Sequence, residues 1–593
     1  MVTFLRGVRR FFRVTPRSCF TNLLYASAAL FTVTLVASQL SQDSVDNDNQ
    51  NPQFDLHKPL QKLHDEQIRG LSANAAAEPA SQRVLAAPAA ATNDDLIAGQ
   101  VYPKLVRNNF VPLNKIIHLD LKGAPYKPTF YNELFTFFNR LGLTGVLIEW
   151  EDMFPYTGKL ADAINGNHYS MADIESILQS AKSHRLEVIP LVQTFGHLEW
   201  ILKLPEFMEL REDKRYPQVI CFAADEAFKL IKQMVDEVAA VHKKFGMKRF
   251  HMGADEAFQV GFCNATLKRM AIDGSKERTI LWHIARTAHY IKDTHNVDVL
   301  AWHDMFAHAN GQDLRYYKMT DVIEPVLWSY AEDLDSYLPF SAWLALKPFK
   351  RVWGSSAIKG ADGPMQYRSN PMHYIKNHES WVTQMNRAYQ EFEVFEGLII
   401  TGWSRYDHLA IMTELLPVNL PTLAMSIETL NEARPLHGSY PWSTEMLQCD
   451  AKYEPGYVYG CRFPGRRVYE LVNELFSQKT QFKKYIDSDY EFNGWLSVVA
   501  RDYNFSSPMY VEKINQFVEY HLNPFERLET SLRQELAVIY FEDTVDEFIL
   551  TYVSAELELL RKSAATIERI RQVGKFARRP FVKYPASKKT QEL

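Results

Sequence analysis

Short hydrophobic segments alternate with longer amphipathic segments along the middle of the chain. The short segments are rich in aliphatic and β-branched residues, which is typical of buried β-strands. The longer segments repeat apolar residues three and four positions apart, as helices with one buried face do. The candidate strands are 116–121, 145–150, 187–192, 247–253, 297–302, 325–328, 352–355 and 398–402, and the clearest helices between them are 130–140, 171–184, 226–245 and 277–294. This order predicts repeated βα units.

Eight such units predict an α/β fold, a TIM-type (β/α)8 barrel that occupies residues 110–431. In barrels of this type the chemistry belongs to the loops at the carboxyl ends of the strands. Polar and aromatic side chains follow that expectation here. They lie at or just past the predicted strand ends, at Glu149, His197, Asp255, Glu256, Asp304, Tyr330 and Trp403.

The strand pattern ends near residue 431. Segments 467–476, 508–520 and 541–571 have helical periodicity, so we predict a helical C-terminal region over 432–575. Residues 576–593 form a basic tail that we expect to be solvated. Binding of this tail to acidic glycans or to another subunit is the alternative interpretation.

A different pattern occupies the N-terminus. Five arginines lie within residues 1–17, and an uncharged run follows at 18–42 that exceeds the roughly 20 residues needed to cross a bilayer. Arginines on this side favour a cytoplasmic tail, a transmembrane signal-anchor and a lumenal remainder. Residues 43–100 are rich in Asp, Asn, Ser, Ala and Pro and are predicted to form a flexible stem. A cleaved signal peptide is the alternative interpretation of the apolar run.

The short anchor and stem suggest a Golgi membrane protein, or one of another secretory-pathway membrane, with single-pass type II topology. A secreted or lysosomal protein is the alternative. Outside the predicted anchor the chain has four cysteines, an even set that is consistent with two disulfides in an oxidising lumen. We predict that Cys221 pairs with Cys263 above the barrel. Asn264 and Asn504 begin acceptor sequons for N-glycosylation.

Composition narrows the class of protein. The chain has 593 residues, 46% of them hydrophobic, which is enough for a large packed core. Its net charge of −5 is small, and no basic stripe with interleaved aromatics occurs, so a nucleic-acid partner has little electrostatic support. A neutral polar substrate is compatible with this charge.

Two adjacent acids carry the strongest chemical signal. Asp255 and Glu256 follow a predicted strand, and consecutive side chains on a strand point to opposite faces. Both can reach one pocket only if the chain is already turning, and Gly253 permits that turn. Glycosidases need such a pair, because one carboxylic acid protonates the leaving oxygen while another carboxylate manages charge at the sugar.

The sequence His251-Met252-Gly253-Ala254-Asp255-Glu256 resembles the His-x-Gly-x-Asp-Glu signature of family-20 glycoside hydrolases, the β-N-acetylhexosaminidases. The chain is particularly similar to the hexosaminidase D branch of that family. The resemblance runs from about residue 116 to about residue 426. It includes the segments 118–125, 149–156, 188–197, 324–328 and 401–408.

The resemblance implies a retaining exo-β-N-acetylhexosaminidase without a cofactor or metal, whose partner is a glycan ending in N-acetylglucosamine or N-acetylgalactosamine. Glu256 is then the general acid/base. Asp255 orients the 2-acetamido group of the substrate, whose oxygen attacks the anomeric carbon as the internal nucleophile. Tyr330 matches the tyrosine that hydrogen-bonds the acetamido oxygen. A core tyrosine with a satisfied hydroxyl is the structural alternative for Tyr330.

Tryptophans and histidines complete the predicted site. We expect Trp328 and Trp403, with Trp302, to form aromatic walls for a sugar, whereas their structural alternative is barrel core. His197 or His251 can hold a carboxylate, and Asp304 can fix the tautomer of an imidazole ring. The substrate-binding set is Tyr330, Trp328, Trp403, Asp407, Trp302, His197 and Asp120, and the orienting set is His251 and Asp304.

The chain departs from the broader family at two strands. Many members have an arginine on the first strand that holds sugar hydroxyls, whereas this chain has Asp120 and Lys122 there. The last strand is followed by Trp403 and Asp407 in place of Trp-x-Glu, so we predict that Asp407 recognises O4 or O6 of the sugar.

Three other classes of protein were weighed. A metal-dependent hydrolase would use the many His and Asp residues, but the chain lacks a His-x-His strand motif. A family-18 chitinase would need an Asp-x-x-Asp-x-Asp-x-Glu strand, which is absent. A membrane-tethered lectin that has lost catalysis is the alternative function, although burying both acids without a use for them would be costly.

Overall fold

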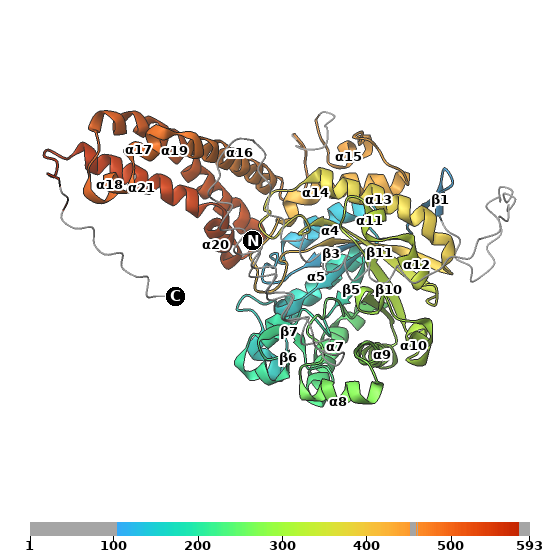
Figure 1. Cartoon of the computed structure of the whole chain (residues 1–593). Coiled ribbons are helices and arrows are strands. Elements are labelled where there is room, and N and C mark those ends of the chain that lie inside the picture. The colour runs from blue at the N-terminus through green and yellow to red at the C-terminus, as the bar shows by residue number, and fades with distance from the viewer. Residues whose placement is uncertain (1–103, 451–457, 459, 580, 582–593) are drawn as a thin grey trace, which may run out of the picture. The chain divides into compact units, whose positions relative to one another are not determined.

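The computed structural model describes residues 104–450, 458, 460–579 and 581 (Figure 1). The predicted cytoplasmic tail (1–17), signal-anchor (18–42) and stem (43–100) lie outside the described residues, as does most of the predicted basic tail (576–593). Among the helices that are described, none combines the length and the apolar character needed to span a bilayer.

A closed barrel of eight parallel strands forms the centre of the catalytic region, as the sequence predicts. Its strand order is β10-β11-β12-β3-β4-β5-β8-β9, and each strand pairs with its neighbours in parallel. The strands are β3 (Asn114–Asp120), β4 (Gly145–Glu149), β5 (Glu187–Leu191), β8 (Arg249–His251), β9 (Asp298–Trp302), β10 (Ile323–Trp328), β11 (Arg351–Lys359) and β12 (Val394–Gly402).

Two antiparallel hairpins lie outside the barrel. The first is β1 (Lys104–Val106) with β2 (Asn109–Val111), and the second is β6 (Arg211–Asp213) with β7 (Tyr216–Ile220). The second hairpin lies in the long connection between β5 and β8.

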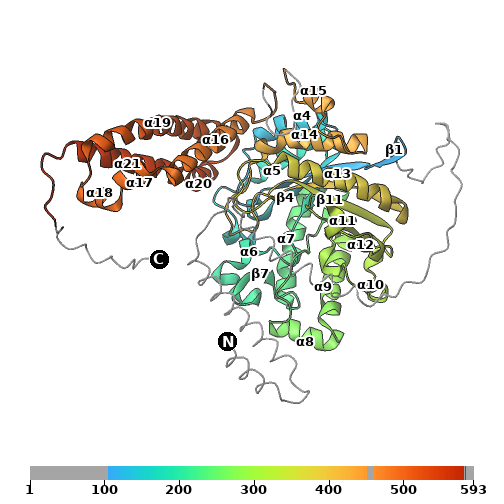
Figure 2. The same ribbon diagram turned by 45° about the horizontal axis from the view of Figure 1, so that its top comes forward.

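Helices cover the outside of the barrel (Figures 1 and 2). They bury their apolar faces on the strands, which explains the spacing of three and four residues in the sequence. In chain order they are α4 (Phe130–Arg140), α5 (Met171–Ser183), α6 (Glu199–Leu202), α7 (Asp225–Lys243), α8 (Asn264–Asp273), α9 (Lys276–His295), α10 (Gly311–Tyr316), α11 (Leu334–Tyr337), α12 (Phe340–Ala345), α13 (Pro371–Ala388) and α14 (Leu416–Glu432).

The C-terminal region is helical, as predicted, but two of its helices extend further than the sequence pattern indicates, and the predicted segment 541–571 is divided into two helices. The elements are α15 (Pro441–Met446), α16 (Arg466–Ser488), α17 (Tyr490–Trp495), α18 (Val498–Tyr503), α19 (Pro508–Ile539), α20 (Glu542–Tyr552) and α21 (Ser554–Arg571). Both ribbon views show α16, α19 and α21 side by side (Figures 1 and 2). Contacts with the barrel include a bridge between Tyr126 and Tyr540.

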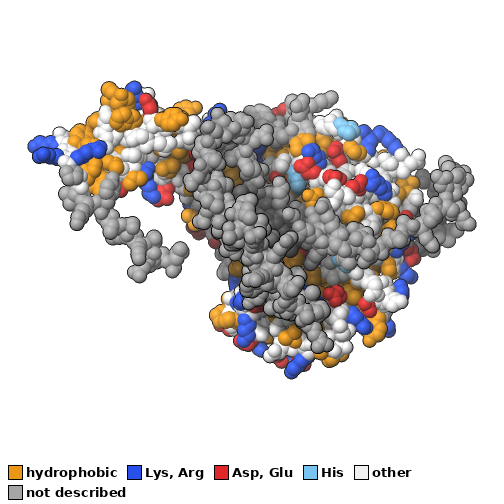
Figure 3. Space-filling model, viewed as in Figure 1, with side chains coloured by type: hydrophobic (Ala, Val, Ile, Leu, Met, Phe, Trp, Pro, Cys, Tyr) orange, Lys and Arg blue, Asp and Glu red, His pale blue; other side chains and the backbone are white. Residues whose placement is uncertain are grey.

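Disulfides join two pairs of cysteines. Cys221–Cys263 confirms the predicted pair, and Cys449–Cys461 uses the remaining two. On the face drawn in Figure 3, acidic and basic side chains are interspersed over the described barrel surface. This mixed surface agrees with the small net charge of −5.

Candidate active site

Side chains from seven strand ends meet at the carboxyl rim of the barrel. Because all eight strands are parallel, their last residues and the loops that follow share one end of the barrel. These side chains lie at or just after the strand ends: Asp120 and Lys122 at β3, Glu149 and Glu151 at β4, His197 at β5, Asp255 and Glu256 at β8, Asp304 at β9, Trp328 and Tyr330 at β10, and Trp403 at β12.

A strained turn carries the two adjacent acids. Gly253, Ala254 and Glu256 have positive φ angles of 64°, 71° and 46°, of which only the first suits its residue type. A Cβ on Gly253 would lie 1.9 Å from Oε1 of Gln193, so any larger residue would clash. The turn cancels the strand alternation, and Asp255 and Glu256 point toward the same place.

His251 supports this turn from below. Its Nδ1 accepts the backbone N–H of Gly253 at 3.0 Å, and its ring packs on Trp302 with 4.3 Å between the ring centres. Burial, with a smaller effect of His118, holds the pKa of His251 well below its usual value, so the ring is neutral. The sequence left open which histidine holds a carboxylate. The contacts place His251 at the backbone of the turn instead.

His197 is the histidine that contacts the acids. Its Nε2 lies 3.4 Å from Oδ2 of Asp255 and 3.3 Å from Oε2 of Glu256. Burial alone would lower the pKa of His197, but Asp255 and Glu256 hold it well above its usual value. A single imidazolium therefore bridges both carboxylates.

The two acids differ in their exposure. The Glu256 side chain is 38% exposed and the Asp255 side chain 9%. A group that must reach a leaving oxygen and later a water molecule needs the open position, whereas a group that only holds part of a substrate can be enclosed. The two adjacent acids therefore occupy different environments, one open to solvent and one enclosed.

Asp304 fixes Glu256 through the backbone. Its Oδ2 accepts the N–H of Glu256 at 2.9 Å and its Oδ1 accepts the indole Nε1–H of Trp328 at 3.1 Å. Burial and the nearby Asp255 raise the pKa of Asp304 to about 7. We expected Asp304 to fix an imidazole tautomer. Its hydrogen bonds instead join the acid-bearing turn to an aromatic wall.

Aromatic rings line one side of the site. Trp328 stacks on Tyr330 with 5.4 Å between ring centres, and the indole Nε1 of Trp403 donates to the Tyr330 hydroxyl at 3.1 Å. These three side chains are partly exposed. Trp302 is only 1% exposed and belongs to the barrel core with Trp353. Trp302 therefore fits the structural alternative, a barrel-core residue, and packs against Trp403.

A buried charge cluster lies beside the aromatic wall. Nζ of Lys122 is 3.4 Å from Asp120, 3.5 Å from Glu149 and 3.6 Å from Glu151. Burial raises the pKa of Glu151 to about 8, although Lys122 opposes that shift. Glu149 also contacts His118 at 3.2 Å. The cluster is closed off from solvent, and its three carboxyl groups surround one ammonium group.

Asp120 was predicted to contact the sugar, and its surroundings do not favour that role. Its side chain is fully buried, Oδ1 accepts the N–H of Lys122 at 3.0 Å, and Oδ2 accepts the N–H of Ser404 at 2.8 Å. These bonds join the loop after β3 to the loop after β12. Asp120 thus offers no exposed oxygen to a substrate and holds two loops together.

No role was predicted from the sequence for Glu151 or for His408, which contacts it. His408 donates from Nδ1 to Glu151 at 2.8 Å and accepts from Lys203 at Nε2 at 2.7 Å. The acidic segment 149–152 could have indicated a charge cluster, but the sequence does not show that these acids are buried. Asp407, on the same loop, accepts the N–H of Leu409 and is half-buried.

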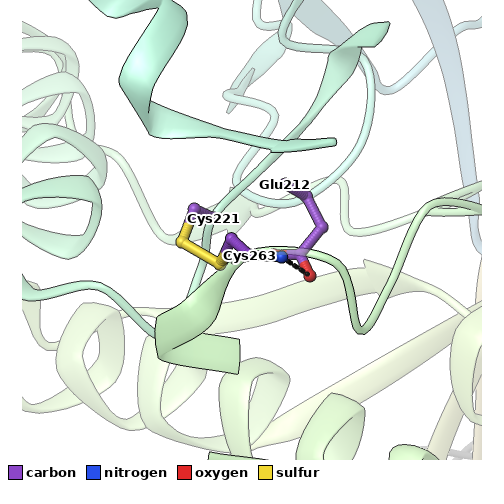
Figure 4. A group of neighbouring side chains, drawn as sticks. All are labelled: Glu212, Cys221 and Cys263. Atoms are coloured by element: carbon purple, nitrogen blue, oxygen red, sulfur yellow. Dashed lines mark hydrogen bonds between the residues drawn. A yellow bond between two sulfur atoms is a disulfide. The ribbon is translucent and has the colours of Figure 1, made fainter. Parts of the chain in front are cut away.

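Two groups of described residues have the composition of metal sites. Glu212, Cys221 and Cys263 form the first, but both sulfurs belong to the disulfide, and Glu212 accepts backbone N–H groups, among them that of Cys263 (Figure 4). The second consists of Glu151, Asp152 and His408, where both imidazole nitrogens already have partners.

The predicted glycosylation sites lie on helix boundaries. Asn264 is the exposed first residue of α8, next to the disulfide. Asn504 follows α18 and its side-chain oxygen accepts from Arg569 at 3.2 Å. Both remain predictions.

Comparisons with known proteins define the class. The model of the glycosyl hydrolase family 20 catalytic domain matches residues 126–333. Hexosaminidase D of Homo sapiens is 31% identical over 462 residues, which cover 75% of this chain and 93% of that protein. Hexosaminidase D of Bos taurus is 37% identical over 332 residues, 55% of this chain and 93% of that protein.

The chain therefore belongs to glycoside hydrolase family 20. It is a hexosaminidase D-like glycoside hydrolase with β-N-acetylhexosaminidase activity. Among solved structures, the β-N-acetylhexosaminidase from Bacteroides fragilis matches with 17% identity and a TM-score of 0.39, over 54% of this chain and 66% of that one.

Proposed function

We propose that the enzyme is a retaining exo-hydrolase that removes terminal β-linked N-acetylglucosamine, N-acetylgalactosamine or both from glycoconjugates by substrate-assisted catalysis without a metal. One observation carries the proposal. Asp255 and Glu256, which differ in exposure, converge on the same nitrogen of His197. An enclosed acid beside an open acid suits a reaction in which one holds the substrate and the other transfers a proton.

Glu256 acts as the general acid/base. Its carboxyl proton moves to the glycosidic oxygen as the bond from that oxygen to the anomeric carbon breaks. The acetamido oxygen of the substrate bonds to the same carbon and gives an oxazolinium intermediate. Water then adds to the anomeric carbon as its bond to the acetamido oxygen breaks, and the water gives a proton to Glu256, so the product keeps the β configuration.

Asp255 stabilises the positive charge that develops on the acetamido group, because its carboxylate accepts the acetamido N–H. The His197 imidazolium sets the direction of both carboxylates, and Asp304 holds the backbone of Glu256 at 2.9 Å. Preorganisation of this kind fixes the charges before the substrate arrives.

The sugar ring is proposed to lie against Trp328 and Trp403, where its C–H groups meet the indole faces. Tyr330 positions the acetamido oxygen from the same side. Asp407 is the proposed contact for O4 or O6, because it is half-buried on the loop that begins with Trp403.

Single-pass type II topology in a Golgi or other secretory-pathway membrane, with the catalytic region in the lumen, completes the proposal. A secreted or lysosomal protein is the alternative. The two disulfides support an oxidising compartment. Treatment of the cellular protein with N-glycosidase tests the lumenal orientation, because a loss of mass requires that a sequon, such as the one at Asn264, was glycosylated.

The roles of the acids are tested with Glu256→Gln and Asp255→Asn on an activated aryl glycoside and on a natural oligosaccharide. An activated leaving group needs little protonation, so Glu256→Gln should keep intermediate formation from the aryl substrate and lose the oligosaccharide. Asp255→Asn should slow both by ~10² to 10³. If Asp255→Asn spared the aryl substrate while Glu256→Gln damaged both equally, the two roles would be exchanged.

A further inference from the structure

Arg405 follows Trp403 by two residues and uses all five of its N–H donors. Its Nε donates to the carbonyl of Lys122 at 2.9 Å, and Nη1 and Nη2 donate to the carbonyls of Ala410 and Gly123 at 2.7 and 3.3 Å. The remaining two donors bind the carboxylate of Glu547 at 2.7 and 2.5 Å. A guanidinium with every donor engaged in a buried position is a rigid junction.

Glu547 comes from α20, outside the barrel. Besides the two bonds from Arg405, its Oε1 accepts the N–H of Met412 at 3.3 Å. Tyr552, at the end of the same helix, donates its hydroxyl to the carbonyl of Met412. One helix of the C-terminal region therefore holds the loop after β12 at two of its residues.

The loop held in this way forms part of the active site. It begins with Trp403, whose indole contacts the Tyr330 hydroxyl, and it contains Asp407. Arg405 also fixes the carbonyls of Lys122 and Gly123 in the loop after β3. The first and last strands of the barrel are thus joined above the sheet by one cation, whose counter-charge comes from α20.

We propose that Glu547 is a positioning residue for the glycosidase reaction, acting through Arg405 on the loop that carries Trp403. The C-terminal region then completes the active site and does more than stabilise the fold. The inference concerns the β-N-acetylhexosaminidase activity of the site and does not depend on the substrate-assisted mechanism.

Removal of the carboxylate leaves a guanidinium without its counter-charge in a position that is only 9% exposed. The loop must shift to bring water to it, and Trp403 moves with the loop. Because small displacements of positioning groups cost large factors in rate, Glu547→Gln should lower kcat/KM on an aryl N-acetyl-β-hexosaminide by ~10- to 100-fold. A larger KM should contribute to this loss, since Trp403 is a wall of the pocket.

Asp546→Asn is the matched control. Asp546 is the neighbouring residue of α20, and its exposed carboxylate pairs with Arg533 of α19 at 2.5 Å. Both substitutions remove one acid from the same helix. We expect both proteins to fold, with kcat/KM of Asp546→Asn within twofold of the wild type.

Hydrogen exchange of the full chain provides a readout that does not depend on turnover. Amides in residues 402–413 should exchange faster in Glu547→Gln and at the wild-type rate in Asp546→Asn. Equal kcat/KM and equal exchange in the two variants would overturn the inference. If the wild type itself hydrolysed no N-acetyl-β-hexosaminide, the proposed function would fail, and exchange would still decide whether Glu547 positions the loop.

A double variant tests whether the effect passes through Arg405. Arg405→Lys keeps the charge but loses the planar fork of donors. If Glu547 acts only through Arg405, the fold-loss of kcat/KM in the double variant should be much smaller than the product of the fold-losses in the two single variants. Losses that multiply would contradict the proposed route.

Discussion

Two acid-rich regions lie at the same rim of the barrel and differ in almost every physical respect. After β8, Asp255 and Glu256 meet a charged histidine, and Glu256 remains open to solvent. After β3 and β4, Asp120, Glu149 and Glu151 surround Lys122 and are closed off from solvent. The first region keeps an acid open to solvent, and the second encloses three carboxyl groups around one lysine.

The difference shows that acid content at a strand end does not define a catalytic site. Carboxylates that have a buried lysine and backbone N–H groups as partners have no exposed oxygen to offer. Carboxylates that share one imidazolium on a strained turn keep an open side for a ligand. Exposure and the identity of the partner separate reaction chemistry from structural support.

The largest expected difference between the two regions appears when one acidic charge is removed from each. Asp120→Asn leaves Lys122 with fewer buried partners and should cost about 3 to 5 kcal/mol of unfolding free energy. Asp255→Asn should cost less stability, because Glu256 still pairs with His197, and should act mainly on the rate. Denaturant unfolding of both variants measures the contrast.

The folded fraction of Asp120→Asn provides the control. Its kcat/KM per folded molecule should stay within about tenfold of the wild type, because Asp120 supports loops and does not touch the sugar. A loss of ~10³ in rate without a loss of stability would return Asp120 to the substrate-binding set.

Sequence periodicity predicted the barrel well for a physical reason. Each strand buries both faces, so aliphatic runs mark it clearly, and all eight appear where expected. The turn at Gly253 and the pairing of Cys221 with Cys263 were also predictable. Strand β8 is shorter than predicted because residues 252 and 253 already belong to the turn.

The sequence did not predict which polar residues face the pocket and which of them support the fold. Asp120 and Trp302 lie at strand ends, as catalytic residues do, but whether a strand-end side chain faces the pocket depends on barrel register and on what covers it. Lys122 and Ser404 cover Asp120, and they come from different strands. Glu547 is more than a hundred residues from Arg405, and no local pattern links them.

The Cys221–Cys263 disulfide belongs to the chain segments that flank Asp255 and Glu256 in the sequence. Cys263 follows Glu256 closely and caps α8, while Cys221 follows β7. Replacing both residues by serine should lower the unfolding free energy by about 2 to 4 kcal/mol, because the unfolded chain loses a cross-link. Unfolding with and without reductant measures the effect. Equal unfolding free energies for the double serine variant and for the oxidised wild type would contradict this expectation.

The smallest expected effect is the dependence of stability on pH. Burial raises the pKa of Asp152, Glu199 and Glu151 to about 6, 7 and 8. Above pH 5 each acid is protonated in the folded chain and ionised in the unfolded chain until the pH reaches its raised pKa, so stability falls as the pH rises from about 5 to 8. Asp120, whose pKa is lowered, titrates below the window and does not contribute to the slope.

Glu151→Gln mimics the protonated acid and tests this assignment. Relative to the wild type, it should gain on the order of 1 kcal/mol of stability for each pH unit between pH 5 and 8. Glu226→Gln, which changes an exposed acid paired with Lys229, is the control and should leave the slope unchanged. Parallel melting curves for the wild type and Glu151→Gln at both pH values would show that Glu151 is ionised throughout.

The most direct test of the central claim compares turnover of 4-nitrophenyl N-acetyl-β-glucosaminide and N-acetyl-β-galactosaminide with that of 4-nitrophenyl β-glucoside, with and without EDTA. If the acetamido group of the substrate is the nucleophile and Asp255 only supports it, the glucoside should be almost inert and EDTA should have no effect. Comparable rates on the glucoside and the N-acetylglucosaminide would contradict the account, because the enzyme would then supply its own nucleophile.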